Sequence, residues 1–247
     1  GDELQTDSGT DAVSRLGSFS RRLLRAAKLA DALGLYGILY VEDPQTPIST
    51  VLGKTTVVDT VRFPRTTLLH RAGDCDDTTA LLCSLYESAG VPTAFVTTPD
   101  HVLMAFDTGE PASRTWLFES ESRVVFRHGG SLWVPVETTV LSEGFTTAWQ
   151  AASERIRQSG GRKEAGFVPL RVARSVYPPL SVPRTELDIL PPAPQERFDA
   201  ARRTASTLVE NLYEPVVARE RERAAAASGA SRVRSLNRLA MLQARFG

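Results

Sequence analysis

The chain lacks several features that would assign it to a class of protein at once. It has no excess of charge, with 29 basic against 29 acidic side chains, which argues against a nucleic-acid or anionic-membrane binder. It has no long hydrophobic run either, because the stretch 29–41 is interrupted by Asp31 and is shorter than the roughly 20 residues that span a bilayer. We therefore expect no nucleic-acid partner and no transmembrane segment.

Cysteine is also scarce, and its two occurrences do not suit a disulfide. Cys75 and Cys83 are eight residues apart in one predicted helix, so their Cα atoms would lie roughly 12 Å from each other. We expect two free thiols. The rest of the composition, 42% hydrophobic and 23% charged over 247 residues, is typical of a globular protein with a sizeable core. Because the first residue is Gly rather than Met, we expect a longer parent protein.

The patterning predicts an α+β fold in the first two thirds of the chain. A helix over 12–33 is followed by a short apolar run at 37–42, an extended connection at 44–63 and a solvated turn at 62–71. A helix over 75–89 comes next, with an antiparallel meander behind it and a further helix over 145–158. The predicted strands of the meander are 93–97, 101–106, 116–119, 123–127 and 132–137.

The last third is predicted to be helical. Six prolines over 176–194 indicate a linker, and an amphipathic helix over 195–223 is expected to kink or break at Pro215. A second helix from Ser235 resembles the first helix of a tetratricopeptide repeat, although a plain terminal helix explains it nearly as well. We thus divide the chain into a helical segment (1–34), a core (35–175), the linker (176–194) and a helical extension (195–247), which would bind a protein partner.

Cys75 is the best candidate for chemistry. It opens a helix after Gly73 and Asp74, where the free N–H groups and the helix dipole favour a thiolate. Cys83 lies between Leu82 and Leu85, as an inert buried cysteine does. A thiol nucleophile at Cys75 would need a base within hydrogen-bonding reach and a group that orients the base.

Three histidines could supply that base. His70 lies in a leucine-rich stretch close to the cysteine, and His128 lies in a glycine turn, so both have ordinary structural explanations. His101 opens the apolar run 102–106 and can face the start of the helix. The orienting carboxylate is expected at Glu137, where a predicted strand ends. Its competitors Glu119 and Glu121 fall in a charged segment typical of a solvated edge.

Together these segments resemble the transglutaminase-like superfamily over roughly 35–150. The resemblance is carried by Arg71-Ala-Gly-Asp-Cys-Asp-Asp77, the helix after it, Ala89-Gly-Val-Pro-Thr-Ala94, His101 and Trp133-Val-Pro-Val-Glu-Thr-Thr139. It implies a papain-like core with Cys75 as nucleophile, His101 as general base and acid, and Glu137 as the residue that orients the imidazole. The chain departs from the family in having Glu where Asp is usual, and in the 36 residues between His101 and Glu137, which leave room for an extra hairpin at 108–130.

The acidic residues around the cysteine form a separate question. Asp74, Asp76 and Asp77 should disfavour a thiolate, although Asp74 is a natural helix cap and Asp77 a structural carboxylate of the first turn. The Asp-Cys-Asp unit resembles that of bacterial transglutaminase-like cysteine proteinases, some of which use calcium. We carry calcium binding by Asp74 and Asp76 as a hypothesis, while the proposed chemistry itself requires no cofactor. For the oxyanion hole, the backbone N–H of Cys75 is one donor, and Gln45 or Tyr40 is a guess for the second.

The leading hypothesis is a thiol-dependent acyl-transfer enzyme, a cysteine peptidase or amidase acting on a protein or peptide. A protein-glutamine transglutaminase would use the same three residues. A peptide-binding module without catalysis remains open, and a purely structural adaptor ranks last, because it needs three independent coincidences. Unpaired cysteines suit the cytoplasm, whereas the family resemblance favours the bacterial periplasm or cell surface.

Overall fold

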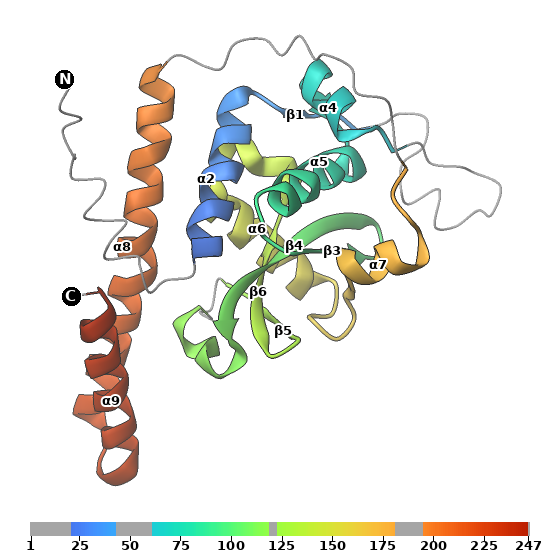
Figure 1. Cartoon of the computed structure of the whole chain (residues 1–247). Coiled ribbons are helices and arrows are strands. Elements are labelled where there is room, and N and C mark those ends of the chain that lie inside the picture. Colours follow the sequence, from blue (N-terminus) through green and yellow to red (C-terminus); the bar gives the residue numbers. More distant parts are fainter. Residues whose placement is uncertain (1–20, 43–60, 119–122, 181–194, 247) are drawn as a thin grey trace.

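A five-stranded antiparallel sheet forms the centre of the computed structural model, which describes residues 21–42, 61–118, 123–180 and 195–246 (Figure 1). The strand order is β5-β6-β4-β3-β7. The strands are β3 (Thr93–Thr98), β4 (His101–Pro111), β5 (Phe126–His128), β6 (Ser131–Val136) and β7 (Gly166–Pro169). The α+β class is thus confirmed, but the meander prediction is wrong in one respect. β6 rather than β5 pairs with β4, because β5 and β6 form a hairpin around Gly129 and Gly130, whose φ angles of 58° and 81° suit glycine.

The sheet is curled. The strands β5 and β7 stand at opposite ends of the strand order, yet the ring of Phe167 on β7 lies 5.0 Å from that of Phe126 on β5. It also lies 5.4 Å from the ring of Trp133 on β6. This closure buries side chains on both faces of the central strand, which explains why 102–106 is a continuous apolar run.

Three helices cover the sheet, and the sequence patterns locate them well. These helices are α2 (Arg21–Tyr36), α5 (Cys75–Ser88) and α6 (Phe145–Gln158). The predicted bounds of α6 are confirmed at both ends, and those of α5 to within one residue. Part of the predicted helix 12–33 lies outside the described residues. The core between helices and sheet contains Tyr86, Phe106, Phe145 and Trp149, all buried.

Short elements around α5 include the main errors of the sequence-based assignment. The expected turn at 62–71 contains a helix, α4 (Pro64–His70), with proline at its first position. The expected strand 116–119 is wrong, because 112–117 forms a 3₁₀ helix, η2 (Ala112–Leu117). In its described parts, 108–118 and 123–130, the segment expected to hold an extra hairpin contains the end of β4, η2 and the strand β5, which pairs with β6. Two further elements, β7 and the helix α7 (Leu170–Val176), were not predicted. A parallel pair, β1 (Leu39–Tyr40) and β2 (Ala72–Gly73), precedes α5.

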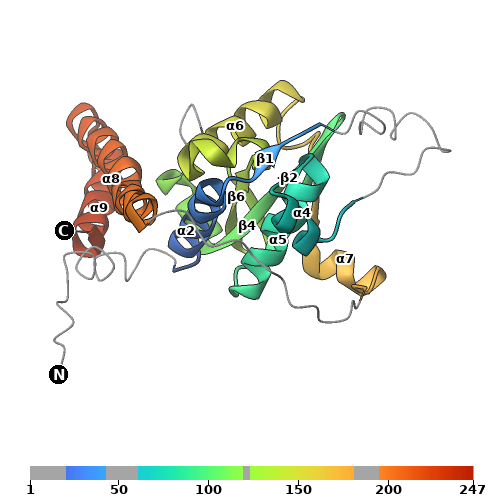
Figure 2. The same cartoon turned by 90° about the horizontal axis from the view of Figure 1, so that it is seen from above.

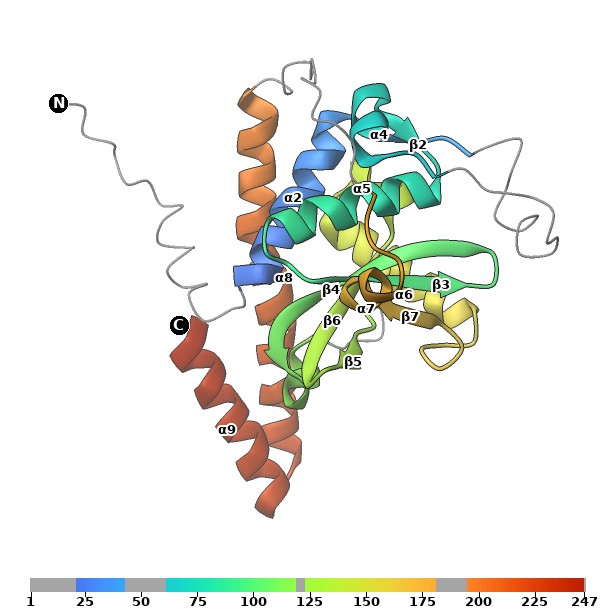
Figure 3. The ribbon, with the colours of Figure 1, turned by 45° about the vertical axis from the view of Figure 1, so that its right-hand side comes forward.

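The C-terminal helices α8 (Gln195–Ala226) and α9 (Gly229–Phe246) form a hairpin beside the core. Helix α2 lies between α8 and the sheet (Figure 2), and α9 folds back along the lower half of α8 (Figure 3). Leu208, Leu212 and Val216 of α8 belong to the same buried cluster as the core, so the extension packs on it directly. The expected break at Pro215 is wrong, because α8 continues through Pro215 and ends at Ala226, three residues beyond the expected end. The helix α9 begins six residues earlier than the expected start at Ser235. The end of the predicted linker, 181–194, lies outside the described residues.

Across the described ranges, no helix combines the length and the apolar character needed to cross a membrane.

Candidate active site

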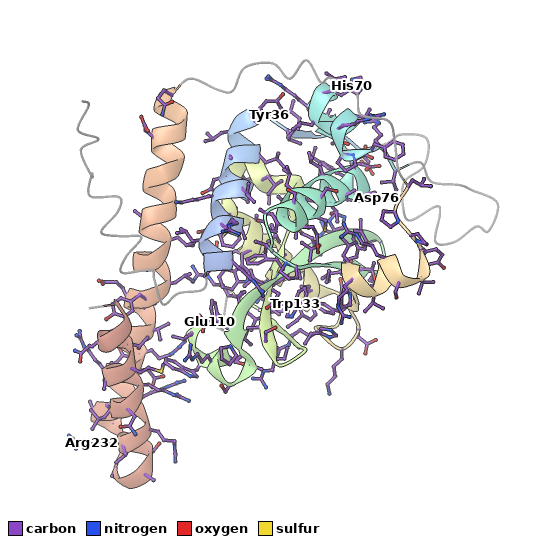
Figure 4. All side chains as sticks on the ribbon, viewed as in Figure 1. Tyr36, His70, Asp76, Glu110, Trp133 and Arg232 are labelled. Atoms are coloured by element: carbon purple, nitrogen blue, oxygen red, sulfur yellow. The ribbon has the colours of Figure 1, made fainter. Side chains whose placement is uncertain are left out.

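The first turn of α5 is built to present Cys75 as the first residue of the helix. Asp74 is the N-cap, with extended backbone angles, and its Oδ1 accepts a hydrogen bond from the N–H of Asp77 at 3.0 Å. Gly73 precedes the cap, and a Cβ there would lie 2.5 Å from the Cβ of Asp77, so the close turn needs glycine. The hydroxyl of Thr78 donates to the carbonyl of Asp74 at 2.7 Å. These contacts fix the place of the thiol. Figure 4 labels Asp76 at this end of the helix.

The thiol of Cys75 is in a buried and acidic environment. The side chain is 6% exposed, and its Sγ donates to Oδ1 of Asp76 at 3.2 Å. Burial, followed by the charge of Asp76 and this hydrogen bond, raises the pKa of the thiol to about 12, against a smaller lowering by the N–H of Val102. The charges of Asp76 and Asp74 both act in the expected direction, against a thiolate.

His101 and Glu137 form a buried pair. Nε2 of His101 lies 2.9 Å from each carboxylate oxygen of Glu137, and the two residues are 5% and 2% exposed. Because an ionised carboxylate only accepts hydrogen bonds, Nε2 carries the hydrogen and Nδ1 is the basic nitrogen of the neutral ring. Glu137 thus fixes both the tautomer and the orientation of the imidazole.

Several donors keep Glu137 ionised. Burial by itself would raise the pKa of the carboxyl, but the hydrogen bond and charge of His101 and the donors of Thr139 together hold the pKa below the ordinary value of 4.5. Thr139 donates to Oε1 through its hydroxyl at 2.8 Å and its N–H at 3.2 Å. Arg155 of α6 adds an ion pair at 3.2 Å from Oε2.

Two links bring Glu137 and His101 to the start of α5. The hydroxyl of Thr138, next to Glu137, lies 2.9 Å from the hydroxyl of Thr78 and 3.0 Å from that of Thr79. These contacts join the 3₁₀ helix η3 (Thr138–Glu143) to the cysteine-bearing helix. On the other side, the N–H of Val102, the residue after His101, reaches the sulfur of Cys75. The three predicted residues therefore come from one junction of α5, β4 and β6.

The alternative candidates lie elsewhere or outside the described residues. His70 is exposed on α4, at the edge of the molecule (Figure 4). His128 packs edge-to-face against Trp133 and at a tilt against Phe167, with ring centroids 5.8 and 5.3 Å apart. Glu119, Glu121 and Gln45 lie outside the described residues.

Tyr40 comes close to the junction. It pairs with Gly73 across β1 and β2, two residues before Cys75. Its pKa is raised by burial and next by the negative charge of a Cys75 thiolate. Tyr40 is 43% exposed, so its hydroxyl is accessible beside the site, and its role as an oxyanion donor remains a prediction.

The acidic residues of the first turn do not fit the calcium hypothesis. Asp74 caps the helix, Asp76 accepts from the thiol, and the buried Asp77 accepts from the N–H of Arg62 at 2.7 Å and pairs with its guanidinium at 3.3 Å. Calcium needs six to eight oxygen ligands. Within the described ranges, no group of three or more His, Cys, Asp or Glu side chains is arranged to hold a metal.

Three residues of the site, Arg155, Thr138 and Thr139, were not among the predicted site residues, and Asp76 was expected in a different role. Arg155 lies on α6, 18 residues after Glu137 in the chain, and its guanidinium pairs with the carboxylate of Glu137. No local sequence pattern indicates that contact. Thr138 and Thr139 follow Glu137 directly, and their position in the quoted motif was the one available signal. Asp76 was considered for calcium, whereas here it accepts the hydrogen bond of the thiol.

The junction thus combines a thiol at a helix N-terminus, an imidazole with a defined tautomer and a buried carboxylate that orients the imidazole. Such a set can carry out nucleophilic acyl transfer once the thiol is deprotonated. Comparisons with protein-family models, with curated proteins and with solved structures found no match to this chain.

Proposed function

We propose that the protein is a thiol-dependent acyl-transfer enzyme of the transglutaminase-like type, most readily a cysteine peptidase or amidase. The observation that carries the proposal is the contact of His101 Nε2 with both oxygens of Glu137 at 2.9 Å, beside a cysteine at the start of a helix. The papain-like core belongs to the same proposal. A cysteine-bearing helix against a curled antiparallel sheet supports it.

The roles of the three residues follow from their chemistry. Nδ1 of His101 takes the proton of Cys75, and the sulfur attacks a carbonyl carbon of a peptide or side-chain amide. The tetrahedral intermediate collapses to a thioester when the C–N bond breaks and the imidazolium gives its proton to the leaving amine. Water, deprotonated by the same imidazole, then attacks the thioester and releases a carboxylic acid and the thiol. Glu137 stabilises the imidazolium throughout.

A change at Cys75 must precede this reaction. The thiol donates to Asp76, and its pKa of about 12 leaves little thiolate near neutral pH. We infer that a rotation of the Cys75 side chain away from Asp76 and toward Nδ1 separates the resting arrangement from the reactive one. An imidazolium next to the sulfur would then offset the aspartate charges, as in other cysteine–histidine pairs.

The same site would be a transglutaminase if an amine rather than water reached the thioester. Hydrolysis is preferred here, because it needs no second protein substrate in the site. The choice is measured directly by adding a primary amine to the acyl-enzyme and comparing amide with acid in the products.

The first experiment measures alkylation of each cysteine against pH by mass spectrometry. Cys75 should label below the ordinary thiol pKa of about 8.5, and His101→Ala should remove that reactivity. Cys83 in the same molecule is the internal reference, because it is 1% exposed in the core. Peptide and glutamine-amide libraries then test turnover, with Cys75→Ala as the inactive control. Slow labelling with an ordinary thiol profile in both proteins would contradict the proposal.

A second candidate function is a peptide-binding module that performs no catalysis. The burial of all three residues and the raised pKa of Cys75 favour it, since a closed site with a protonated thiol has no turnover. In that case Cys75→Ala would bind the peptides selected by the wild type equally well, and no acyl-enzyme would appear by mass spectrometry. The extension α8–α9 would then be the surface for a protein partner.

A further inference from the structure

A second charged region lies where the C-terminal hairpin meets the core, away from the cysteine. A cavity of about 520 Å³ opens between η2 and β5 on one side and the helices α8 and α9 on the other. Four of the residues that line it are arginines: Arg127, Arg219, Arg223 and Arg238. The whole chain has no net charge, so this concentration is a local property of the surface.

The partners of these guanidinium groups include a carbonyl and a hydroxyl oxygen as well as a carboxylate. Arg223 and Arg238 share one oxygen of the buried Glu220, at 2.8 and 3.3 Å. Arg219 donates to the carbonyl of Trp116 at 2.6 Å, and Arg127 donates to the hydroxyl of Thr115 at 2.9 Å. In the part of the chain that the structure describes, Glu220 pairs with two of the four arginines that line the cavity. Burial and the neighbouring charge of Arg223 lower the pKa of Arg219, as expected where positive charge accumulates.

The region extends along the hairpin. A second cavity of about 380 Å³ shares Arg223 and Arg238 with the first and adds Arg234, together with the hydroxyls of Ser231 and Ser235. Arg232 does not line either cavity and points away from the core at the outer side of α9 (Figure 4). Arg223, Arg234 and Arg238 therefore face the cavities, whereas Arg232 faces outward.

From this arrangement we propose that the joined cavities bind an oligophosphate group. Guanidinium groups bind phosphate oxygens bidentately, and the hydroxyls of Ser231 and Ser235 can donate to the same oxygens. Two adjoining cavities with shared arginines match a chain of phosphates better than a single anion. Because the lining residues come from η2, β5, α8 and α9, the bound ligand would join the hairpin to the core. This site does not depend on the proposed chemistry of Cys75.

The test is a calorimetric titration of the full chain with inorganic tripolyphosphate at low salt. We expect saturable binding to one site, at least tenfold tighter than that of orthophosphate. Arg127→Gln and Arg234→Gln should each weaken it by about tenfold, the usual cost of a lost charge-assisted hydrogen bond. Neither variant disturbs the Glu220 pairs. Arg232→Gln, on the same hairpin, is the matched control and should bind as the wild type does.

Four results would overturn the assignment. Absence of saturable heat would remove the site, and equal weakening by Arg232→Gln would reduce it to diffuse electrostatic attraction. Equal affinity for citrate would remove the preference for phosphate. Binding of a polyglutamate peptide without binding of tripolyphosphate would assign the surface to an acidic protein partner instead.

Discussion

The two cysteines of the chain lie at the first residue of α5 and in its second half, in different environments. In both cases the pKa of the thiol is raised to about 12. At Cys83 burial is the main cause, among core side chains such as Leu82 and Tyr86. At Cys75 burial acts together with the charge and hydrogen bond of Asp76. The two thiols therefore have similar pKa values for different reasons.

The difference determines which thiol can be activated. Around Cys83 burial dominates, and the smaller contributions of Thr93, Glu87 and Arg174 act in opposing directions. The environment of Cys75 consists of individual charges and hydrogen bonds from Asp74, Asp76 and Val102, which a rotation or a bound substrate can rearrange. The polar first turn of the helix should therefore respond to single charges and to pH more strongly than the buried second half.

The largest expected effect is on the carboxylate that supports the polar end. Glu137→Ala would leave His101 and Arg155 without their buried partner, and the free energy of unfolding at pH 7 should fall by about 3–5 kcal/mol. Urea unfolding measures it. If that variant does not fold, Glu137→Gln keeps the shape and loses only the charge.

The same carboxylate predicts a pH dependence. The pKa of Glu137 is lower in the folded protein than its ordinary value of 4.5, so the unfolded chain binds more protons in acid. The stability it contributes is complete above the ordinary pKa and is lost as the pH falls through the folded value. The difference in unfolding free energy between wild type and Glu137→Gln should therefore shrink below about pH 4.3. A constant difference from pH 7 to pH 3 would contradict this account.

Removing the charge of Asp76 should change the reactivity of Cys75 but not that of Cys83. Asp76→Asn keeps an acceptor for the thiol and removes the negative charge that is the second cause of the raised pKa. We expect the pKa of Cys75 to fall by about one unit, which increases alkylation about tenfold at a fixed pH below the pKa. Cys83 should be unchanged. Glu143→Gln, an exposed carboxylate of η3, is the matched control, and an equal response there would contradict a local effect.

The contrast between local signals and contacts with distant parts of the chain also decides which elements the sequence could predict. The helices at 75–88 and 145–158 were predicted because their apolar periodicity and their glycine ends are local signals. Part of the 3₁₀ helix at 112–117 was expected to be a strand, because its end carries large apolar residues, Trp116 and Leu117. The packing of these residues against α8 depends on residues far away in the sequence. The pairing of β6 with β4 likewise depends on tertiary packing.

For the site, residue types and order indicated Cys75, His101 and Glu137, and the 2.9 Å contacts bring the last two together. The pair formed by Arg155 and Glu137 joins residues 18 positions apart in separate elements, and no periodicity reports it. The acceptor role of Asp76 depends on a side-chain rotamer, which composition and spacing do not determine.

A smaller effect is expected in the apolar half of α5. Cys83→Ala removes a sulfur from a site that is 1% exposed, and the lost packing should cost about 1 kcal/mol of unfolding free energy. That cost should change little between pH 5 and pH 8, because burial is the largest cause of the raised thiol pKa and the charges of Glu87 and Arg174 act on it in opposite directions. Urea unfolding of Cys83→Ala and Cys75→Ala at both pH values makes the comparison. A pH-dependent cost at Cys83 would show that the two halves are coupled.

The smallest expected effect is that of calcium. Asp74 uses its Oδ1 as the helix cap, and Asp76 accepts from the thiol, so a calcium ion would have to displace both contacts to gain two ligands. About 10 mM calcium exceeds the dissociation constants of weak extracellular calcium modules. A site of that kind would raise the unfolding free energy by more than about 1 kcal/mol through binding to the folded state. We expect no change in melting temperature or in the labelling rate of Cys75. A stabilisation that disappears in Asp76→Asn but persists in Glu143→Gln would instead require the first turn of α5 to rearrange around the ion, and the acidic residues would then act as ligands.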